Sequence, residues 1–185
     1  MSPPTLRSPA DAVDNPALRQ QAGGMRDSMR LLVVGAGPVA DALAPMVAAL
    51  GWEATSARTM AEVESALREA DAVIVTSHDD GVDAPAIGAA LAAGISYVGG
   101  MGSRKTQARR RDWLVANGVS QTDLPAVRAP IGLDIGADSP GEIAVAILAE
   151  IIAVRRGATA VGPISAREGA IHPDQEPGTA YCPEG

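Results

Sequence analysis

The sequence predicts an α/β fold with a doubly wound, mainly parallel sheet. Short apolar runs alternate with segments of helical periodicity, which is the pattern of repeated strand–helix units. The first run, Leu31–Val34, passes through a glycine-rich turn into a helix. Hydrophobic residues make up 46% of the 185 residues but aromatic residues only 2%, with no phenylalanine. An aliphatic core of this kind suits the layers of an α/β domain.

Five strands are predicted, each a short run between turn residues or helical segments. Ala72–Thr76 is the clearest, because it is continuous and almost wholly apolar. Glu53–Ala57 is the weakest, because polar residues interrupt it. The predicted strands are Leu31–Val34, Glu53–Ala57, Ala72–Thr76, Ile95–Val98 and Ala126–Ala129.

The predicted helices carry start and stop signals. Thr59 and Glu62 have the spacing of a capping box, and so do Ser139 and Glu142. Pro45 should kink the first helix or weaken one of its turns. The predicted helices are Val39–Leu50, Met60–Ala70, Asp83–Ala93, Arg104–Asn117 and Pro140–Arg156. The last is apolar almost all round over Ile143–Val154, so it either lies centrally in the fold or forms a face for a second copy.

The chain divides into a flexible lead over residues 1–28, one domain over 29–157 and a flexible tail over 158–185, because both ends are rich in proline and glycine and lack periodicity. The single cysteine, Cys182, falls in the tail, which excludes a disulfide framework and a cysteine-rich zinc site and fits a cytoplasmic protein. No apolar run reaches about 18 residues, and the N-terminus lacks a signal-peptide core, so we expect no membrane partner.

Net charge is −7 and the isoelectric point is about 4.8. A general nucleic-acid binder is usually basic, so we expect no nucleic-acid partner. A local cluster of basic residues is therefore an exception on an acidic chain.

The turn after the first strand matches G-x-G-x-x-A, the dinucleotide-binding pattern, which makes the predicted fold Rossmann-like. Gly35 allows the tight turn, Gly37 lets a phosphate approach the backbone, and Ala40 keeps the helix close to the sheet. The candidate binding residues of this turn are Gly35, Gly37, Pro38, Val39 and Ala40.

The second half of that pattern is missing. An acidic residue should end the second strand and bind a ribose hydroxyl, but Ala57 and Arg58 stand there and Glu53 begins the strand. Arg58 either meets a 2′-phosphate or another anion, or is a solvated loop arginine. Classical NAD binding is therefore less well supported than the fold.

Two further loops should gather at the carboxyl edge of the sheet. After the third strand come Thr76, Ser77, His78 and Asp79. Either His78 and Asp79 supply acid–base or metal-ligand chemistry, or Asp79 or Asp80 caps the next helix while His78 hydrogen-bonds the loop. One histidine beside carboxylates is a weak metal signal, so we assign no metal site.

The loop after the fourth strand is glycine-rich and then strongly basic. Glycines 99, 100 and 102 permit close backbone approach, and Ser103 is a candidate N-cap. Arg104 and Lys105 stand at a helix N-terminus, where the helix dipole opposes them, so an anion such as phosphate would explain them. The candidate binding residues here are Gly102, Ser103, Arg104 and Lys105. Arg109–Arg111 are adequately explained as solvated residues that pair with the acidic surface.

The segment Arg128–Gly136 is apolar yet full of turn residues, which predicts a packed, ordered loop. Following a fifth strand, it would reach the same edge of the sheet. It either contributes to a site there or is a buried connection without function.

Taken together, these segments resemble the C-terminal Rossmann domain of the XdhC/CoxI family over roughly Arg30–Gly157. The matching segments are LLVVGAGPVA, AVIVTSHDDGVDAPAI, YVGGMGSRKTQARRRDWL and APIGLDIGADSPGEIAVAILAEIIAVRRG. The GSR-x-x-x-x-RR loop and PIGLDIGA carry most of the specificity.

The resemblance implies a role in maturing molybdenum hydroxylases, such as xanthine dehydrogenase and aerobic carbon monoxide dehydrogenases. Family members bind molybdenum cofactor (molybdopterin), a phosphate-bearing pterin, help it acquire its sulfido ligand with a cysteine desulfurase, and pass it to the apoenzyme. This chain departs from the usual pattern in two ways. About 30 low-complexity residues stand where the family has a separate N-terminal domain, and Ala57 stands where the family often has Asp.

Three functions follow as expectations. The first is a cofactor-handling accessory protein rather than a stand-alone catalyst, with a molybdenum hydroxylase apoenzyme as partner and no evident nucleophile. The second is an NAD(P)-linked oxidoreductase, which the glycine turn favours and the missing ribose carboxylate disfavours. The third is a nucleotide-binding interaction subunit. The client enzyme and the oligomeric state are left open, although a homo-oligomer is one possibility.

Overall fold

The computed structural model describes residues 28–158 and 161–166. The predicted lead apart from Ser28, and most of the predicted tail with Cys182, lie outside these residues. Within them, five parallel strands form one sheet in the order β2-β1-β3-β4-β5. The strands are β1 Arg30–Val34, β2 Glu53–Ala57, β3 Ala72–Val75, β4 Tyr97–Gly100 and β5 Val127–Arg128. The helices are α2 Pro38–Ala49, α3 Met60–Leu67, α4 Asp83–Ala92, α5 Arg104–Ala116 and α6 Pro140–Arg155, with short 3₁₀ turns η2 Leu124–Ala126 and η3 Ile164–Ala166.

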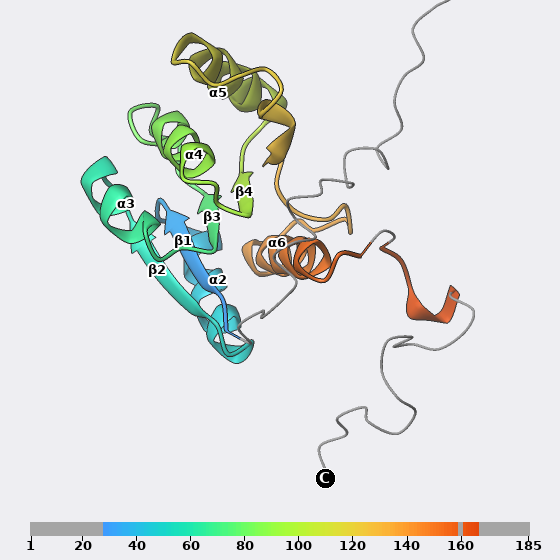
Figure 1. The fold of residues 1–185 in the computed structure, drawn as a ribbon. Coiled ribbons are helices and arrows are strands. Elements are labelled where there is room, and N and C mark those ends of the chain that lie inside the picture. The colour runs from blue at the N-terminus through green and yellow to red at the C-terminus, as the bar shows by residue number, and fades with distance from the viewer. Residues whose placement is uncertain (1–27, 159–160, 167–185) are drawn as a thin grey trace, which may run out of the picture.

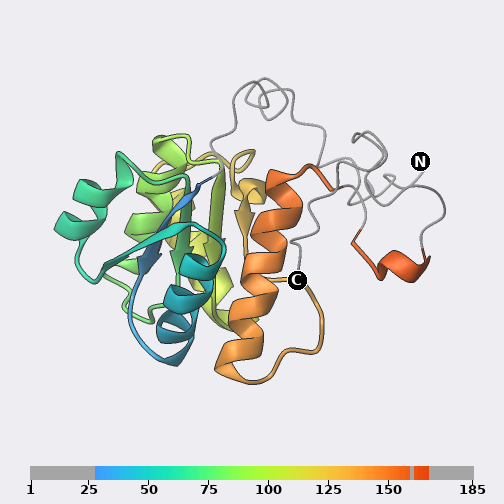
Figure 2. The same ribbon diagram turned by 90° about the horizontal axis from the view of Figure 1, so that it is seen from below.

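The sheet lies between two helical layers. Helices α2 and α6 cover one face, and α3, α4 and α5 cover the other (Figure 1). Seen from below, α6 and α2 lie side by side in front of the sheet (Figure 2), and they pack directly on each other. This arrangement confirms the predicted doubly wound α/β fold.

Strand β1 shows why the sequence folds this way. Leu31 and Val33 point into the core beneath α2 and α6, while Leu32 and Val34 point into the core on the opposite face. All four side chains are buried, because a central parallel strand is covered on both faces. A continuous apolar run is therefore the expected sequence of such a strand.

The predicted capping boxes are confirmed. Thr59 accepts a hydrogen bond from the Glu62 N–H, and Ser139 accepts one from the Glu142 N–H, while each glutamate carboxylate bonds back to the N-cap backbone. Helix α2 continues through Pro45, which lies on an exposed part of the helix. The bond that proline removes is therefore lost on the solvated side, where Asp41, whose carbonyl would accept it, is exposed.

The predicted position of the fourth strand was wrong. The fourth strand is Tyr97–Gly100, two residues later than the predicted Ile95–Val98. Gly99 and Gly100 are thus buried members of the sheet and not part of the loop. The fifth strand is also shorter than predicted. Among the described residues, no helix is long and apolar enough to cross a membrane.

Candidate functional site

The strand order places a switch point between β1 and β3. From β1 the chain steps to one side to form β2, and then returns past β1 to form β3, β4 and β5 on the other side. Loops on opposite faces diverge at such a point, and ligands of doubly wound sheets bind outside the carboxyl ends of the strands there. The loops that follow β1 and β3 are therefore the first candidates for a site.

These two loops are in direct contact. Gly35 has a φ of 117°, and a Cβ atom at this position would lie 2.6 Å from the backbone nitrogen of Ser77. The N–H groups of Thr76 and Ser77 both donate to the carbonyl of Val34. Only glycine fits at position 35, because any side chain would collide with the neighbouring loop.

Gly37 occupies a different environment in the same turn. Its φ is 127°, but nothing lies within 4 Å of the position its Cβ would take. It is the N-cap of α2 and offers no side-chain cap, and Pro38 follows it at the first helical position. Among the described residues, the N–H groups of Val39 and Ala40 have no acceptor. An open backbone and unpaired donors are what an anion needs at a helix N-terminus.

In the β3 loop, which is the segment between β3 and α4, most polar side chains form hydrogen bonds with nearby backbone groups. The Thr76 hydroxyl is buried and donates to the Val34 carbonyl at 3.3 Å. Ser77 Oγ accepts from the Asp79 N–H at 2.9 Å, and Asp79 Oδ1 accepts from the Gly81 N–H at 2.8 Å. Asp79 thus shapes the turn that leads into α4 without capping that helix, so the predicted aspartate cap is wrong.

His78 has no such role. Its side chain is exposed and makes no hydrogen bond within the part of the chain that the structure describes. The helix cap is Val82 and not an aspartate, and Asp80 pairs with Arg109 at 2.6 Å. In residues 28–158 and 161–166, no group of three or more His, Cys, Asp or Glu side chains could hold a metal ion.

The tip of β2 lies against the glycine turn. The Gly35 N–H donates to the Ala57 carbonyl at 2.8 Å, which brings the following residue, Arg58, beside the turn. The backbone N–H groups of Arg58 and Thr59 both donate to the Glu62 carboxylate, and these bonds hold the pKa of Glu62 below its usual value. The Arg58 side chain is exposed and makes no ion pair with a described residue.

The β4 loop is shorter than predicted, because two of its glycines belong to the strand. A Cβ at Gly99 would lie 2.4 Å from the Ile131 side chain, and one at Gly100 would lie 3.1 Å from the Arg110 guanidinium. These glycines therefore make room for protein side chains and not for a ligand. Gly102, with a φ of 129°, is the glycine that turns the loop.

Helix α5 begins as predicted. Ser103 is its N-cap and accepts from the Thr106 N–H at 3.2 Å. Arg104 and Lys105 occupy the first turn, and both side chains are exposed without an ion pair among the described residues. Two cations thus stand unneutralised where the helix dipole already contributes positive potential.

Arg110 is the residue that sequence reasoning placed wrongly. Predicted as solvated, it is 3% exposed and donates to the carboxylate of Asp83 at 2.6 Å. It also donates to the carbonyl oxygens of Ser77, at 3.0 Å, and Met101. One guanidinium therefore ties the β3 loop and the β4 loop to the underlying helices. Its spacing of four residues from the buried Leu114 was the available signal.

Glu150 was also missed. Its carboxylate accepts from the Tyr97 hydroxyl at 2.6 Å and from the Gly132 N–H at 2.8 Å, and it lies 3.5 Å from the Arg128 guanidinium. Burial, and then the bond to Glu150, raise the pKa of the Tyr97 hydroxyl, which stays protonated and donates. A single carboxylate inside an otherwise apolar helix was the signal.

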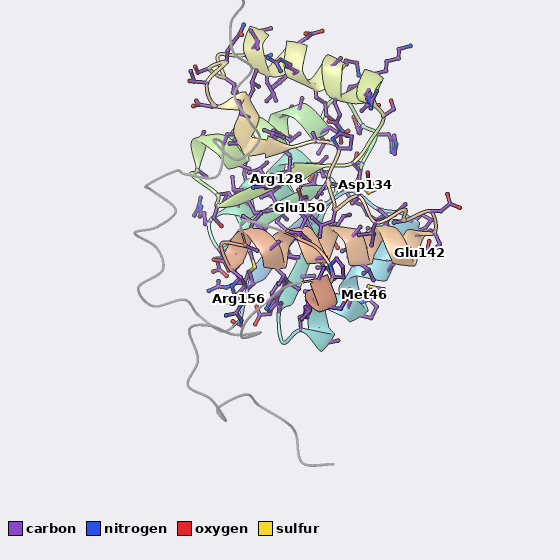
Figure 3. All side chains as sticks on the ribbon, turned by 90° about the vertical axis from the view of Figure 1, so that its right-hand side faces the viewer. Met46, Arg128, Asp134, Glu142, Glu150 and Arg156 are labelled. Atoms are coloured by element: carbon purple, nitrogen blue, oxygen red, sulfur yellow. The ribbon has the colours of Figure 1, made fainter. Side chains whose placement is uncertain are left out.

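This network explains the packed loop after β5. Ile131 lies over Gly99 and its N–H donates to the Gly100 carbonyl, while Gly132 packs against Ala146 of α6. Figure 3 shows Glu150 and Arg128 on the side of α6 toward the sheet edge. The first half of the loop is packed as predicted, and Gly132 fits a close contact with α6, whereas Ile135 is 54% exposed.

A cavity of about 470 Å³ lies away from the carboxyl edge, between β1, β2 and α3. Glu53, Glu62 and Glu69 line it, and Arg30 pairs with Glu69 at 2.8 Å. The charged residues of the lining are three glutamates and one arginine, so its net charge is negative and disfavours a phosphate-bearing ligand. The cationic carboxyl edge is the better candidate for such a ligand.

Comparisons with known proteins agree with this architecture. Residues 31–151 match the family model described as the XdhC Rossmann domain. The chain is 32% identical over 133 residues to the molybdenum cofactor insertion chaperone PaoD of Escherichia coli (strain K12), a match that covers 71% of this chain and 42% of that protein. It is 28% identical over 158 residues to the uncharacterized protein YqeB of the same strain, covering 73% of this chain and 28% of that protein.

A similar fold occurs in a crystal structure described as a xanthine dehydrogenase from Bacillus halodurans. The TM-score is 0.54 at 22% sequence identity, and the match covers 70% of this chain and 45% of that one. This likeness concerns the fold alone. The chain spans less than half the length of the curated relatives it matches.

Proposed function

This chain belongs to the XdhC family by its Rossmann domain, and from that premise we propose that it is an accessory protein in the maturation of a molybdenum hydroxylase of the xanthine dehydrogenase or carbon monoxide dehydrogenase type. Its cargo is molybdenum cofactor, held by its phosphate at the carboxyl edge of the sheet. The relative PaoD, a molybdenum cofactor insertion chaperone, supports the choice of cargo. The apoenzyme is the receiving partner, and a cysteine desulfurase is the expected source of sulfur.

One observation carries the proposal. The turn at Gly37 is open, the first N–H groups of α2 have no acceptor among the described residues, and the β3 loop holds the turn rigidly through its contact at Gly35. A preformed turn of this kind does not have to be ordered when the anion binds, which lowers the cost of binding.

The charges around the turn fit a phosphate. The exposed cations Arg58, Arg104 and Lys105 follow β2 and β4, whose carboxyl ends lie at the same edge as the turn. The nearby carboxylates are already engaged, Asp79 in its own turn and Asp80 with Arg109. Arg104 and Lys105 therefore make no ion pair among the described residues, although the whole chain carries a net charge of −7. The Arg58 charge interacts with the carboxylate of Glu62.

In this proposal each group of residues has its own role in binding the cofactor. The N–H groups of Val39 and Ala40, beside Gly37 and Pro38, bind the phosphate. Arg104 and Lys105 neutralise it through charge-assisted hydrogen bonds. The exposed imidazole of His78 contacts the pterin, while Thr76, Ser77 and Asp79 hold the loop that carries it. When bound, the cofactor supplies the metal centre that the client enzyme uses, and this chain binds, orients and releases it.

An NADPH-binding oxidoreductase is the second candidate, and the position of Arg58 favours it. The Gly35–Ala57 bond brings Arg58 beside the glycine turn, where a cation would meet a ribose 2′-phosphate. The same position lacks the carboxylate that NADH requires. This alternative therefore predicts NADPH binding in preference to NADH.

Calorimetric titration of the purified protein with molybdenum cofactor, NADPH and NADH separates these functions. We expect molybdenum cofactor to bind most tightly. The double variant Arg104→Ala/Lys105→Ala should weaken binding about tenfold or more, since each charge-assisted hydrogen bond contributes about 1.5–3 kcal/mol. Arg111→Ala is the matched control, because Arg111 is exposed on the same helix outside its first turn.

Two results would overturn the proposal. Tight NADPH binding with substrate-dependent hydride transfer would establish the oxidoreductase instead. Cofactor binding that is equally strong in the double variant and the control would place the cargo elsewhere. Co-purification of the protein from its source cells, with analysis of bound pterin and of any hydroxylase that accompanies it, then identifies the client.

A further inference from the structure

The solvent-facing side of α6 is unusual for a surface helix. Five positions, Glu142, Val145, Ala149, Ile152 and Arg156, follow one another at spacings of three and four residues and therefore lie along one side. We call this side the α6 outer face. All five residues are exposed or half-buried, and Val145 is 48% exposed, whereas Ala144, Ile147 and Ile151 on the other side are buried against the sheet.

The middle of the α6 outer face is apolar and the two ends are charged. Figure 3 shows Glu142 and Arg156 at opposite ends of the helix as it faces the viewer. Leu50 of the α2 C-terminus, 40% exposed, adjoins the Arg156 end. The outer face of α5 is different, because it carries several arginines and a lysine. Val145 is exposed and Ala149 and Ile152 are half-buried, and neighbouring accessible apolar residues with a charged rim are typical of a protein–protein contact.

A hollow lies beside the Arg156 end of the face. Its volume is about 180 Å³, and Leu50, Trp52, Ile152, Arg155 and Arg156 line it. The Arg155 guanidinium stacks over the Trp52 ring at 5.4 Å, which gives the hollow a firm wall. It can receive an aliphatic side chain such as valine.

The face is complementary to itself, and we propose that a second copy of this chain packs on it, with the two α6 helices antiparallel about a two-fold axis at Ala149. Glu142 and Arg156 each lie seven residues from Ala149, about 10.5 Å along the helix axis. A two-fold axis there brings Glu142 of each copy opposite Arg156 of the other. The same operation brings Val145 of each copy to the hollow beside Ile152, so every contact occurs twice.

The charged ends are available for this pairing. Within the described residues Arg156 makes no ion pair, and Glu142 uses one carboxylate oxygen in its capping box while the other accepts no bond. Ala149 at the centre allows close approach, because a larger side chain would hold the helices apart. Antiparallel helices also place opposite ends of their dipoles together. These features favour a second copy over an acidic or a basic partner, each of which would match only one end.

Light scattering after size exclusion tests the proposal on the full chain over a concentration series. We expect the wild type to reach twice the 18.7 kDa mass of the chain. Arg156→Glu places a negative charge opposite Glu142 of the second copy, and Val145→Asp brings a carboxylate into the apolar contact. Each variant should therefore be a monomer. Val115→Asp is the matched control, since Val115 is 39% exposed on α5 in the opposite layer. Circular dichroism checks that each variant is folded.

Cysteine cross-linking tests the axis independently. Helices that pack about 8–10 Å apart, with Cα atoms about 2.3 Å from each axis, bring facing Cα atoms to about 3.4–5.4 Å, a range that overlaps the distances of disulfides. In a Cys182→Ser background, Ala149→Cys should form a covalent dimer on mild oxidation and Val115→Cys should not. A monomeric wild type at every concentration would overturn the proposal. So would a dimer that both face variants leave intact. The outcome does not depend on whether the chain binds molybdenum cofactor.

Discussion

Arg110 Nη2 lies 2.6 Å from Asp83 Oδ2, and both side chains are almost fully buried, at 3% and 1% exposed. The pair joins α5 to the start of α4, and the same guanidinium bonds the backbone of the two loops after β3 and β4. A buried ion pair contributes little net stability compared with a well-packed apolar pair, but removing one partner leaves an uncompensated charge. The loops at the carboxyl edge therefore depend on both residues.

Asp83→Ala should destabilise the fold by about 3–5 kcal/mol, because the Arg110 charge would then be buried without a partner. Urea denaturation of the variant and the wild type measures the difference. The double variant Asp83→Leu/Arg110→Met should recover much of the loss, since it removes both charges together. A loss below about 0.5 kcal/mol in the single variant would mean that water reaches the pair.

Gly35 and Gly37 offer a matched comparison, because both have a φ near 120° but only Gly35 is in contact with another loop. Gly37→Ala should cost about 1–3 kcal/mol from backbone strain alone. Gly35→Ala should cost distinctly more, because its methyl group would collide with the Ser77 backbone at 2.6 Å. Equal losses in the free energy of unfolding would show that the β3 loop shifts without cost.

Gly99→Ala should destabilise the protein by about 1–3 kcal/mol, because the added methyl group overlaps Ile131, whose Cδ1 lies 2.4 Å from its position. Shortening the opposing residue, Ile131→Ala, should relieve the overlap. A double-mutant cycle on the free energy of unfolding should therefore give a favourable coupling of about 0.5–3 kcal/mol. Additive effects would place the two residues apart in solution.

The capping glutamate of α6 should make stability depend on pH. Backbone N–H groups of Ser139 and Asp138 donate to Glu142 and lower the pKa of its carboxyl. A group whose pKa is lower when folded contributes stability that is present above its unfolded pKa, about 4.3, and that is lost as pH falls through the lower folded value.

Glu142→Gln removes this titration but keeps a side chain that can cap. Melting temperatures measured from pH 6 down to pH 3 should therefore fall less steeply for the variant than for the wild type. Glu64→Gln is a suitable control, because Glu64 is exposed on α3 and lies outside that helix's capping box. Parallel curves for Glu142→Gln and the wild type would contradict the prediction.

Features set by short-range spacing were predictable from sequence. The glycine turn at Gly35 and Gly37, the capping boxes of α3 and α6 and the N-cap Ser103 each depend on residues no more than a few positions apart. The alternation of strand and helix then leaves few arrangements, because connections in parallel sheets are right-handed. The fold class and the edge that gathers the loops therefore follow from the amino-acid order.

Features that depend on contacts between residues distant in sequence could not be predicted from the sequence. Gly99 and Gly100 were predicted to lie in the loop after the fourth strand, but they belong to β4, and Ile131 and Arg110 fill the space beside them. In the same way, Tyr97 and Gly132 become partners of Glu150 only after β4, β5 and α6 have assembled.

The run Arg109–Arg111 shows the division most clearly. The amino-acid sequence determined that a basic helix begins at Arg104, because Ser103 caps it and the glycine before it turns the chain. It did not determine which arginine enters the core. Tertiary packing selects Arg110, because the rotation of α5 on the sheet brings that side chain to Asp83, 27 residues earlier in the chain. A charge can be buried only where a distant partner and polar backbone groups replace its water.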